Sequence, residues 1–278
     1  MATGKPGANA VQTVVKMTRR IGTLAGLAVV SLMKTILAAW KLARLAAHFA
    51  RGLRTVARDF PTFNALQKEQ AVKAWALAML GIIAIKLIVN GKPPTQGPVL
   101  LAANHISWLD TVVLMANCPN RFVAKAEVRH WPVLGKLAAA NGTLFVTRES
   151  PRDAVRVVHQ MAEHLKEGDV LTVFPEGTTS NGVDLLPFHA NLFQAAISAD
   201  ASVQPVALQF TEVSSGQTSL APCYVGDDSL LQSLWRTLKA PPLSAVVSFG
   251  EPQKPAGRDR RTLARETQAV VRALRSAV

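Results

Sequence analysis

Cysteine and acidic residues are scarce in this chain of 278 residues. Its two cysteines, Cys118 and Cys223, lie far apart and form no CxxC pair. This excludes a secreted domain stapled by disulfides, and a reducing compartment fits the composition. We expect both thiols to be small, buried side chains.

Several motifs are also missing. The chain contains no P-loop and no Rossmann glycine pattern, so there is no basis for a nucleotide cofactor. No helix-turn-helix, zinc-finger or RNP-like pattern appears, and basic residues flank apolar runs instead of aromatic platforms. A nucleic-acid partner is therefore not expected. Ser107 has no G-x-S-x-G elbow around it, which argues against a serine nucleophile.

Basic residues are in excess and are concentrated at one end of the chain. The 31 Lys and Arg outnumber the 18 Asp and Glu, giving a net charge of +13. Ten of the basic residues fall within residues 1–60, where Asp59 is the one acidic residue. Cations interleaved with apolar side chains favour anionic membrane lipids as a partner, at about 1 kcal/mol for each cation near the surface.

Two apolar segments in this basic region predict a membrane-associated pair of helices. Ile21 to Trp40 is long enough to span a bilayer, and a second apolar helix is expected over Ala71 to Val89, after a basic connector from His48 to Gln70. We favour a hairpin that enters one leaflet. Two membrane spans, or a second helix that packs on the catalytic domain, remain alternatives.

From Pro98 onward, short apolar runs alternate with helical segments. This alternation predicts an α/β fold with a mostly parallel mixed sheet flanked by helices on both faces. The expected organisation is a disordered N-terminus over residues 1–12, the helical hairpin over 13–92 and a catalytic domain over 93–278. Expected strands cover 99–103, 121–124, 143–147, 170–174, 203–210 and 245–249, and expected helices cover 110–116, 133–140, 152–167, 188–199, 229–238 and 260–277.

The most informative stretch, from Asn104 to Asp110, follows the first of these strands. His105 and Asp110 are five residues apart. A neutral imidazole can accept a proton near neutral pH, and a carboxylate on its far nitrogen fixes the tautomer. This spacing alone is also typical of a buried histidine with a structural partner. A zinc site is not expected, because no third or fourth ligand lies at readable spacing.

Three further blocks each lie at the edge of an expected strand. They are Gly142 to Arg148, Phe174-Pro175-Glu176-Gly177-Thr178 and Val203 to Val206. Together with Asn104 to Asp110, over about Val99 to Leu208, they resemble the glycerolipid acyltransferase family of enzymes that acylate lysophosphatidic acid and related lysolipids. The bacterial 1-acylglycerol-3-phosphate and lyso-ornithine lipid acyltransferases are the most similar branches.

The resemblance implies roles for particular residues. His105 and Asp110 match the catalytic pair, and the matching substrate-binding positions are Asn104, Gly142, Arg148, Glu176, Gly177 and Thr178. Arg148 can grip a phosphate through two parallel hydrogen bonds. Lys125 lies in a basic loop that could meet phosphates of coenzyme A or an acidic carrier protein. A solvated loop is an equally good interpretation of Lys125.

Two departures from the family pattern bear on the acceptor. Thr179 stands where many members that use phosphate acceptors carry Arg, and His189 stands where Lys is frequent. His189 could partly compensate if protonated. The sequence therefore favours transfer of an acyl group to 1-acylglycerol-3-phosphate from acyl-CoA or acyl carrier protein, with lyso-ornithine lipid as the alternative acceptor.

We expect the enzyme to act at the cytosolic face of the inner membrane, with no resident cofactor. Two alternative functions from other classes are also compatible with the sequence. One is a non-catalytic membrane-surface protein that retains the motifs, and the other is an esterase or thioesterase that passes the acyl group to water.

Overall fold

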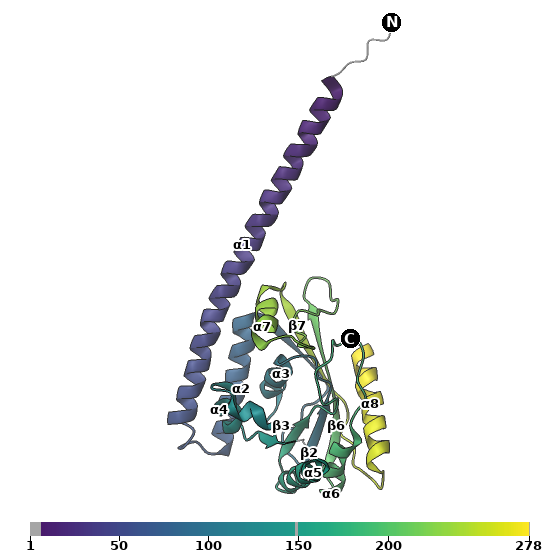
Figure 1. Ribbon diagram of the computed structural model, residues 1–278. Helices are drawn as coiled ribbons and strands as arrows, with labels where there is room; N and C mark the ends of the chain where they lie inside the picture. Colours follow the sequence, from purple (N-terminus) through teal and green to yellow (C-terminus); the bar gives the residue numbers. More distant parts are fainter. Residues whose placement is uncertain (1–6, 148–149, 278) are drawn as a thin grey trace.

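The computed structural model describes residues 7–147 and 150–277, and a seven-stranded sheet forms its centre (Figure 1). The strand order is β1-β7-β6-β2-β5-β3-β4. Five strands are parallel, whereas β7 runs antiparallel to β6 and is joined in parallel by β1. The strands are β1 (Ile85–Asn90), β2 (Val99–Ala103), β3 (Arg121–Lys125), β4 (Leu144–Val146), β5 (Val170–Val173), β6 (Ser202–Glu212) and β7 (Leu243–Phe249).

Helices cover both faces of the sheet, as the alternation of the sequence predicts. One face packs against α2 (Ala65–Ile83), α3 (Leu109–Asn117) and α7 (Leu230–Lys239). The other packs against α5 (Pro151–Lys166), α6 (Gln194–Ser198) and α8 (Arg260–Ser276). Short segments α4 (Leu134–Ala140), η1 (Ala126–His130) and η2 (Ala190–Phe193) complete the fold.

Strand β2 shows why the sheet requires two covering layers. Leu101 and Ala103 join the core beneath α2 and α3, whereas Leu100 and Ala102 join the core beneath α5 and α8. All four are fully buried. Since successive side chains of a strand point to opposite faces, a continuous apolar run can be buried only between two layers. The predicted mostly parallel α/β fold is confirmed.

The N-terminal region forms two helices that run side by side in opposite directions. Helix α1 (Gly7–Arg58) packs against α2, α4 and α7, and its N-terminal part extends past the sheet (Figure 1). The connection is tight, because Asn64 caps α2 by accepting a hydrogen bond from the N–H of Gln67 at 2.9 Å. The Gln67 side chain returns the bond to the N–H of Asn64, which makes a capping box.

The structure differs from four expected boundaries in this region. The second helix ends at Ile83, not Val89, because Ala84 adopts a left-handed conformation with φ 63°. Strand β1 follows at Ile85, so the chain enters the sheet before residue 93, where the catalytic domain was expected to begin. The connection between the helices spans only residues 59–64, not 48–70. Residues 7–12 are helical, and the remainder of the segment expected to be disordered, 1–6, lies outside the described residues.

None of the helices that the structure describes is long and apolar enough to cross a membrane.

Candidate active site

The candidate site begins where β2 ends. The loop after Ala103 carries Asn104 and His105, and α3 starts at Leu109 with Asp110 in its first turn. Strands β2, β5, β3 and β4 run parallel, so the residues that follow them meet at one edge of the sheet. Sites in open α/β sheets gather at this carboxyl edge.

The structure brings His105 and Asp110 into direct contact. His105 Nδ1 lies 2.8 Å from Asp110 Oδ2. The same oxygen accepts hydrogen bonds from the backbone N–H groups of Ile106 at 2.7 Å and Ser107 at 2.8 Å. Asp110 is fully buried, whereas the His105 side chain is 21% exposed. A proton on Nδ1 leaves Nε2 as the basic nitrogen of a ring that solvent or a substrate can reach.

Two groups from the loop after β5 fix the backbone and ring of His105. The ring stacks on Phe174 with 3.9 Å between centroids and 13° between planes. The backbone N–H of His105 donates to Glu176 Oε1 at 2.7 Å, and the N–H of Leu186 donates to Glu176 Oε2 at 2.9 Å. Burial raises the pKa of the Glu176 carboxyl.

Glu176 is held by backbone groups of the protein. Its side chain is only 4% exposed, and both carboxylate oxygens are engaged by backbone N–H groups. The prediction that Glu176 binds substrate stays a prediction, and in the structure its carboxylate has a positioning role. It ties the loop after β5 to the backbone of His105.

Asn104 is also held by backbone groups of the protein. Its side chain is 1% exposed. The amide donates from Nδ2 to the carbonyl of Leu208 at 3.0 Å and accepts at Oδ1 from the N–H of Leu208 at 2.7 Å. Both polar atoms of the side chain thus bind β6. Asn104 fixes the start of the catalytic loop against the neighbouring strand and has no free side-chain atom for a substrate.

Three other expected residues lie together on the loop after β5. The turn from Phe174 closes through a hydrogen bond from the N–H of Gly177 to the carbonyl of Phe174, and Gly177 has φ +73°. A Cβ at this position would lie 3.1 Å from the ring of His189, so glycine allows both the conformation and the close approach. Thr178 and His189 are exposed beside it.

The remaining expected residues are spread more widely. Lys125 is exposed at the carboxyl end of β3, on the same edge as His105. Gly142 precedes β4, at the amino edge of the sheet, where a Cβ would lie 2.7 Å from the guanidinium of Arg121. The structure therefore does not bring Gly142 to the site. Arg148, which follows β4, lies outside the described residues.

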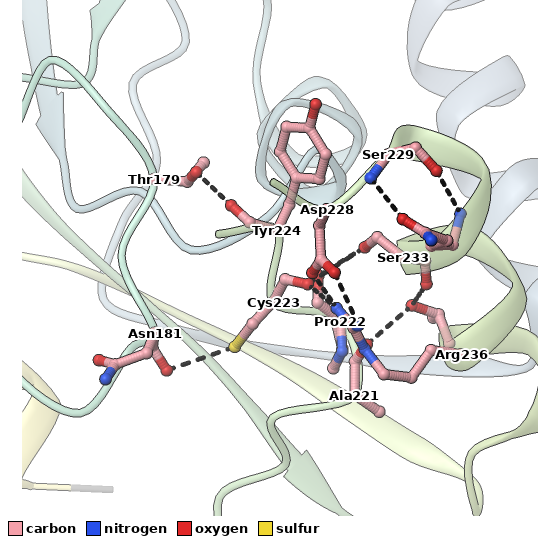
Figure 2. A network of polar contacts seen from close by, with 12 residues as sticks. Thr179, Asn181, Ala221, Pro222, Cys223, Tyr224, Asp228, Ser229, Ser233 and Arg236 are labelled. Atoms are coloured by element: carbon pink, nitrogen blue, oxygen red, sulfur yellow. Dashed lines mark hydrogen bonds and ion pairs between the residues drawn. The ribbon is translucent and has the colours of Figure 1, made fainter. Parts of the chain in front are cut away.

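One segment at the site carries no recognisable motif. Residues 221–228, between β6 and α7, cover the catalytic loop: the N–H of Tyr224 donates to the carbonyl of Ile106 at 3.0 Å. The Thr179 hydroxyl donates to the carbonyl of Tyr224, and Cys223 Sγ donates to the carbonyl of Asn181 at 3.3 Å (Figure 2). The one possible signal in the sequence was that Tyr224 is the chain's single tyrosine.

Helix α7 anchors this segment. Arg236 forms an ion pair with Asp228 at 2.7 Å, and its Nε donates to the carbonyl of Ala221 at 3.0 Å (Figure 2). Ser233 Oγ, which is buried, donates to the carbonyl of Cys223 at 3.2 Å. It also lies 3.3 Å from Nε1 of Trp108, a residue of the catalytic loop. The 221–228 segment and α7 thus contact the catalytic loop at Ile106 and Trp108, on the C-terminal side of His105.

A cluster with the spacing of metal ligands lies elsewhere. Within the described ranges, His164, Glu167 and Asp169 form the single group of three such side chains that lie close together. Asp169 is also paired with Arg121, at 3.0 Å. A guanidinium at this distance competes with any cation, and the group lies at the amino edge, away from His105.

A histidine held by a buried aspartate at the carboxyl edge of a mixed α/β sheet suits enzymes that activate a hydroxyl by general-base catalysis. Comparison with known proteins identifies the class. Residues 86–209 match the family model described as Acyltransferase. The chain is 39% identical over 205 residues to a lyso-ornithine lipid O-acyltransferase of Pseudomonas aeruginosa, covering 74% of this chain and 78% of that one.

Two further comparisons give the same class of protein. A 1-acyl-sn-glycerol-3-phosphate acyltransferase of Neisseria gonorrhoeae is 41% identical over 184 residues, covering 66% of this chain and 71% of that one. A crystal structure of the 1-acyl-sn-glycerophosphate acyltransferase PlsC from Thermotoga maritima shares the fold, with a TM-score of 0.66, 19% identity, and coverage of 89% of this chain and 95% of that one. The chain belongs to the acyltransferase family, and the protein is an acyltransferase.

Proposed function

We propose that this acyltransferase transfers a fatty acyl group from a thioester donor to the free hydroxyl of 1-acylglycerol-3-phosphate, giving phosphatidic acid. The donor is acyl-CoA or acyl carrier protein, which acts as a co-substrate. The observation that carries the proposal is the 2.8 Å contact between His105 Nδ1 and Asp110 Oδ2, supported by the names of the relatives.

In this mechanism His105 acts as the general base. Its Nε2 takes the proton from the acceptor hydroxyl while the oxygen attacks the thioester carbonyl carbon. Asp110 orients the ring and stabilises the imidazolium that forms. The tetrahedral intermediate then collapses, the C–S bond breaks and the thiolate leaves, taking the proton back from Nε2. A base placed in this way contributes about 10²- to 10⁴-fold in rate.

Direct transfer without an acyl-enzyme fits the environment of Ser107. This hydroxyl is fully buried, and its oxygen accepts a hydrogen bond from the N–H of Leu109 at 3.2 Å, in the first turn of α3. A serine nucleophile would have to be exposed beside the base. Ser107 instead satisfies a backbone N–H at the start of the helix.

Exposed nitrogen-bearing side chains at the carboxyl edge support a phosphate-bearing acceptor. Lys125 is exposed at the end of β3, and His189 is exposed against Gly177. Arg148 follows β4, a strand that is parallel to β3, and the proposal assigns its guanidinium to the acceptor phosphate.

A second acceptor, lyso-ornithine lipid, is favoured by Thr179. The hydroxyl of Thr179 donates to the carbonyl of Tyr224, so this position contributes neither a cation nor a free donor to the acceptor site. Relatives named lyso-ornithine lipid O-acyltransferase, from Pseudomonas aeruginosa and Brucella abortus, are 39% and 40% identical to the chain. An acceptor without a phosphate would not require a cation here.

The proposed site of action is the cytosolic face of the inner membrane, with anionic lipids as partners of the N-terminal helices. Exposed apolar side chains on α1 support this, since a surface of this kind is costly in water and is stabilised at a bilayer interface. They are Val29, Val30, Leu32, Met33, Ile36, Leu37, Trp40 and Leu42.

The test is acyl transfer by the purified protein. Labelled acyl-CoA and labelled acyl carrier protein are each incubated with a panel of lysolipids, and mass spectrometry identifies the products. Phosphatidic acid formed from 1-acylglycerol-3-phosphate supports the proposal. Acylation of lyso-ornithine lipid with none of 1-acylglycerol-3-phosphate selects the second acceptor. Free fatty acid as the sole product would identify an esterase and refute both.

A further inference from the structure

A cavity separate from the catalytic loop lies where α1 meets the ends of α2 and α7. Its volume is about 320 Å³, and its lining comes from α1, from the last residues of α2 and from the segment at the end of α7. We call it the basic groove, because four cationic side chains line it: Lys34, Lys41, Arg44 and Lys239. None of the residues expected at the active site lines it.

The cations of the basic groove are not neutralised by the protein. No acidic residue lines the cavity. Within the part of the chain that the structure describes, none of the four forms an ion pair. Like charges that converge without a counter-ion repel one another, so an anion bound among them would be stabilised.

One of the four already has a structural role. Lys41 Nζ donates to the carbonyl of Ile83 at 3.1 Å, at the end of α2, where a cation interacts favourably with the helix carbonyls. Burial lowers the pKa of Lys41. Lys34 is exposed, Arg44 lies over the ring of Trp40 at 4.5 Å, and Lys239 lies 6.0 Å from the ring of Trp235. These three remain available to a ligand.

Apolar side chains exposed on the same helix indicate where the ligand comes from. Leu37 and Trp40 line the basic groove and are 49% and 55% exposed, and Met33 and Ile36, one turn away, are 65% and 61% exposed. A soluble phosphate would need the cations but not this apolar surface. A membrane lipid offers both an anionic head group and an apolar chain beside it.

We propose that the basic groove binds the phosphate-bearing head group of an anionic glycerophospholipid, held in the membrane and distinct from the acyl acceptor. The proposal rests on the membrane association given under the proposed function but does not depend on acyl transfer. Because α7 also anchors the 221–228 segment through Arg236, a lipid bound at Lys239 would contact the helix that supports the catalytic loop.

Vesicle flotation tests the proposal. The full-length protein is mixed with vesicles of phosphatidylcholine alone, or of phosphatidylcholine and phosphatidylglycerol in equal parts. The groove variant is K34Q/R44Q/K239Q. The matched control is R260Q/R261Q/R265Q, which removes the same charge from exposed positions on α8, a helix on the opposite face of the sheet.

We expect the groove variant to bind phosphatidylglycerol vesicles about a hundredfold more weakly, since each cation at an anionic surface contributes about fivefold. The control should change by less than about threefold, because its charges lie on the opposite face of the sheet, where salt screens their attraction to the bound surface. Equal losses in the two variants would overturn the proposal, because they would show attraction by net charge alone. If the triple variant fails to fold, Lys34→Gln alone replaces it, with Arg265→Gln as its control.

Trp40 fluorescence distinguishes the sources of phosphate. Phosphatidylglycerol vesicles should shift the emission of the wild type to shorter wavelength, and Trp40→Phe should abolish most of that shift. Inorganic phosphate or glycerol phosphate in solution should produce none. A shift caused by soluble phosphate and not by vesicles would refute a membrane lipid as the ligand. Acyl transfer in detergent is measured for the groove variant in parallel, so failure of lipid binding and failure of catalysis are separate results.

Discussion

The Glu176 carboxylate lies 2.7 Å from the backbone nitrogen of His105 and accepts its hydrogen bond. Its second oxygen accepts from the N–H of Leu186 at 2.9 Å. A carboxylate can satisfy two backbone donors at once because each of its oxygens is an acceptor. Glu176 therefore sets the position of the catalytic loop relative to the loop after β5, and its effect on catalysis passes through His105.

Glu176→Gln should lower kcat by about tenfold and destabilise the fold by about 1–3 kcal/mol, with little effect on the acceptor KM. Glutamine has one acceptor oxygen, so one of the two buried N–H groups loses its partner. Steady-state kinetics and urea unfolding measure the two effects. Glu163→Gln, at an exposed ion pair, is the control and should change neither. A variant with unchanged kcat and a raised KM would instead support direct binding of substrate by Glu176.

Asp110→Asn should lower kcat by roughly 10²- to 10⁴-fold, because the amide cannot hold the His105 tautomer or stabilise the imidazolium. The chain provides a matched control in Asp169→Asn. His164 and Asp169 are also five residues apart, with Nδ1 and Oδ2 at 3.0 Å, but they lie at the opposite edge of the sheet. Similar losses of kcat in the two variants would indicate a general effect on folding and would contradict the assignment.

Thr179→Arg should increase transfer to 1-acylglycerol-3-phosphate relative to lyso-ornithine lipid by about tenfold, the value of one additional charged hydrogen bond. The ratio of kcat/KM for the two acceptors measures the change. Thr179→Val removes the hydroxyl that donates to Tyr224 without adding charge, so it separates the loss of this contact from the gain of a cation. An unchanged ratio in Thr179→Arg would place the acceptor head group elsewhere.

The stability of the protein should depend on Cys118 at alkaline pH. Burial raises the pKa of its thiol to about 11. As pH rises above about 9, the unfolded chain loses this proton while the native state keeps it. The unfolded state then binds fewer protons, so the free energy of unfolding falls as pH rises.

Between about pH 8 and pH 10 the wild type should lose about 1 kcal/mol more stability than Cys118→Ala. A difference of one pKa unit between the folded and unfolded states corresponds to about 1.4 kcal/mol. Urea unfolding of both proteins at the two pH values measures the difference. Parallel pH profiles would show that the thiol ionises in the native state as readily as in the unfolded chain.

The sheet was largely predictable because its strands are short, buried and mostly apolar runs. Strand β5 is buried along its whole length, as is β7, and each is bounded by turn residues. Strand β1 was missed because its apolar residues continue those of α2 without a glycine or proline between them. Helix α2 ends at Ile83 because Ala84 adopts a left-handed conformation, although no glycine marks this position. The strand is stabilised by its pairing with the distant β7.

In the first helix the error was the reverse, because an end was expected at a point where the helix continues. The basic residues after His48 suggested a connector, yet α1 continues to Arg58. Gly52 lies against the indole of Trp75, where a Cβ would be only 2.7 Å from Nε1. Glycine is therefore required here by packing between two helices and does not end the helix.

The catalytic pair was predictable from the sequence, whereas the contacts that hold it in place were less so. His105 and Asp110 are close in sequence, so local geometry alone brings them together. Asn104 and Glu176 are polar and adjoin motifs, but their partners, Leu208 and Leu186, are determined by the fold. The same holds for the 221–228 segment, which reaches Ile106 through a backbone hydrogen bond. Backbone contacts of this kind leave no trace in residue types.

The central claim is that His105 is the general base of acyl transfer, and single-turnover formation of diacyl lipid from labelled acyl-CoA by His105→Ala tests it most directly. His164→Ala is the matched control, because His164 has the same contact with an aspartate five residues later. We expect His105→Ala to lose at least about a hundredfold in rate and still bind vesicles, while His164→Ala retains activity. Wild-type rates in His105→Ala, or equal losses in both variants, would contradict it.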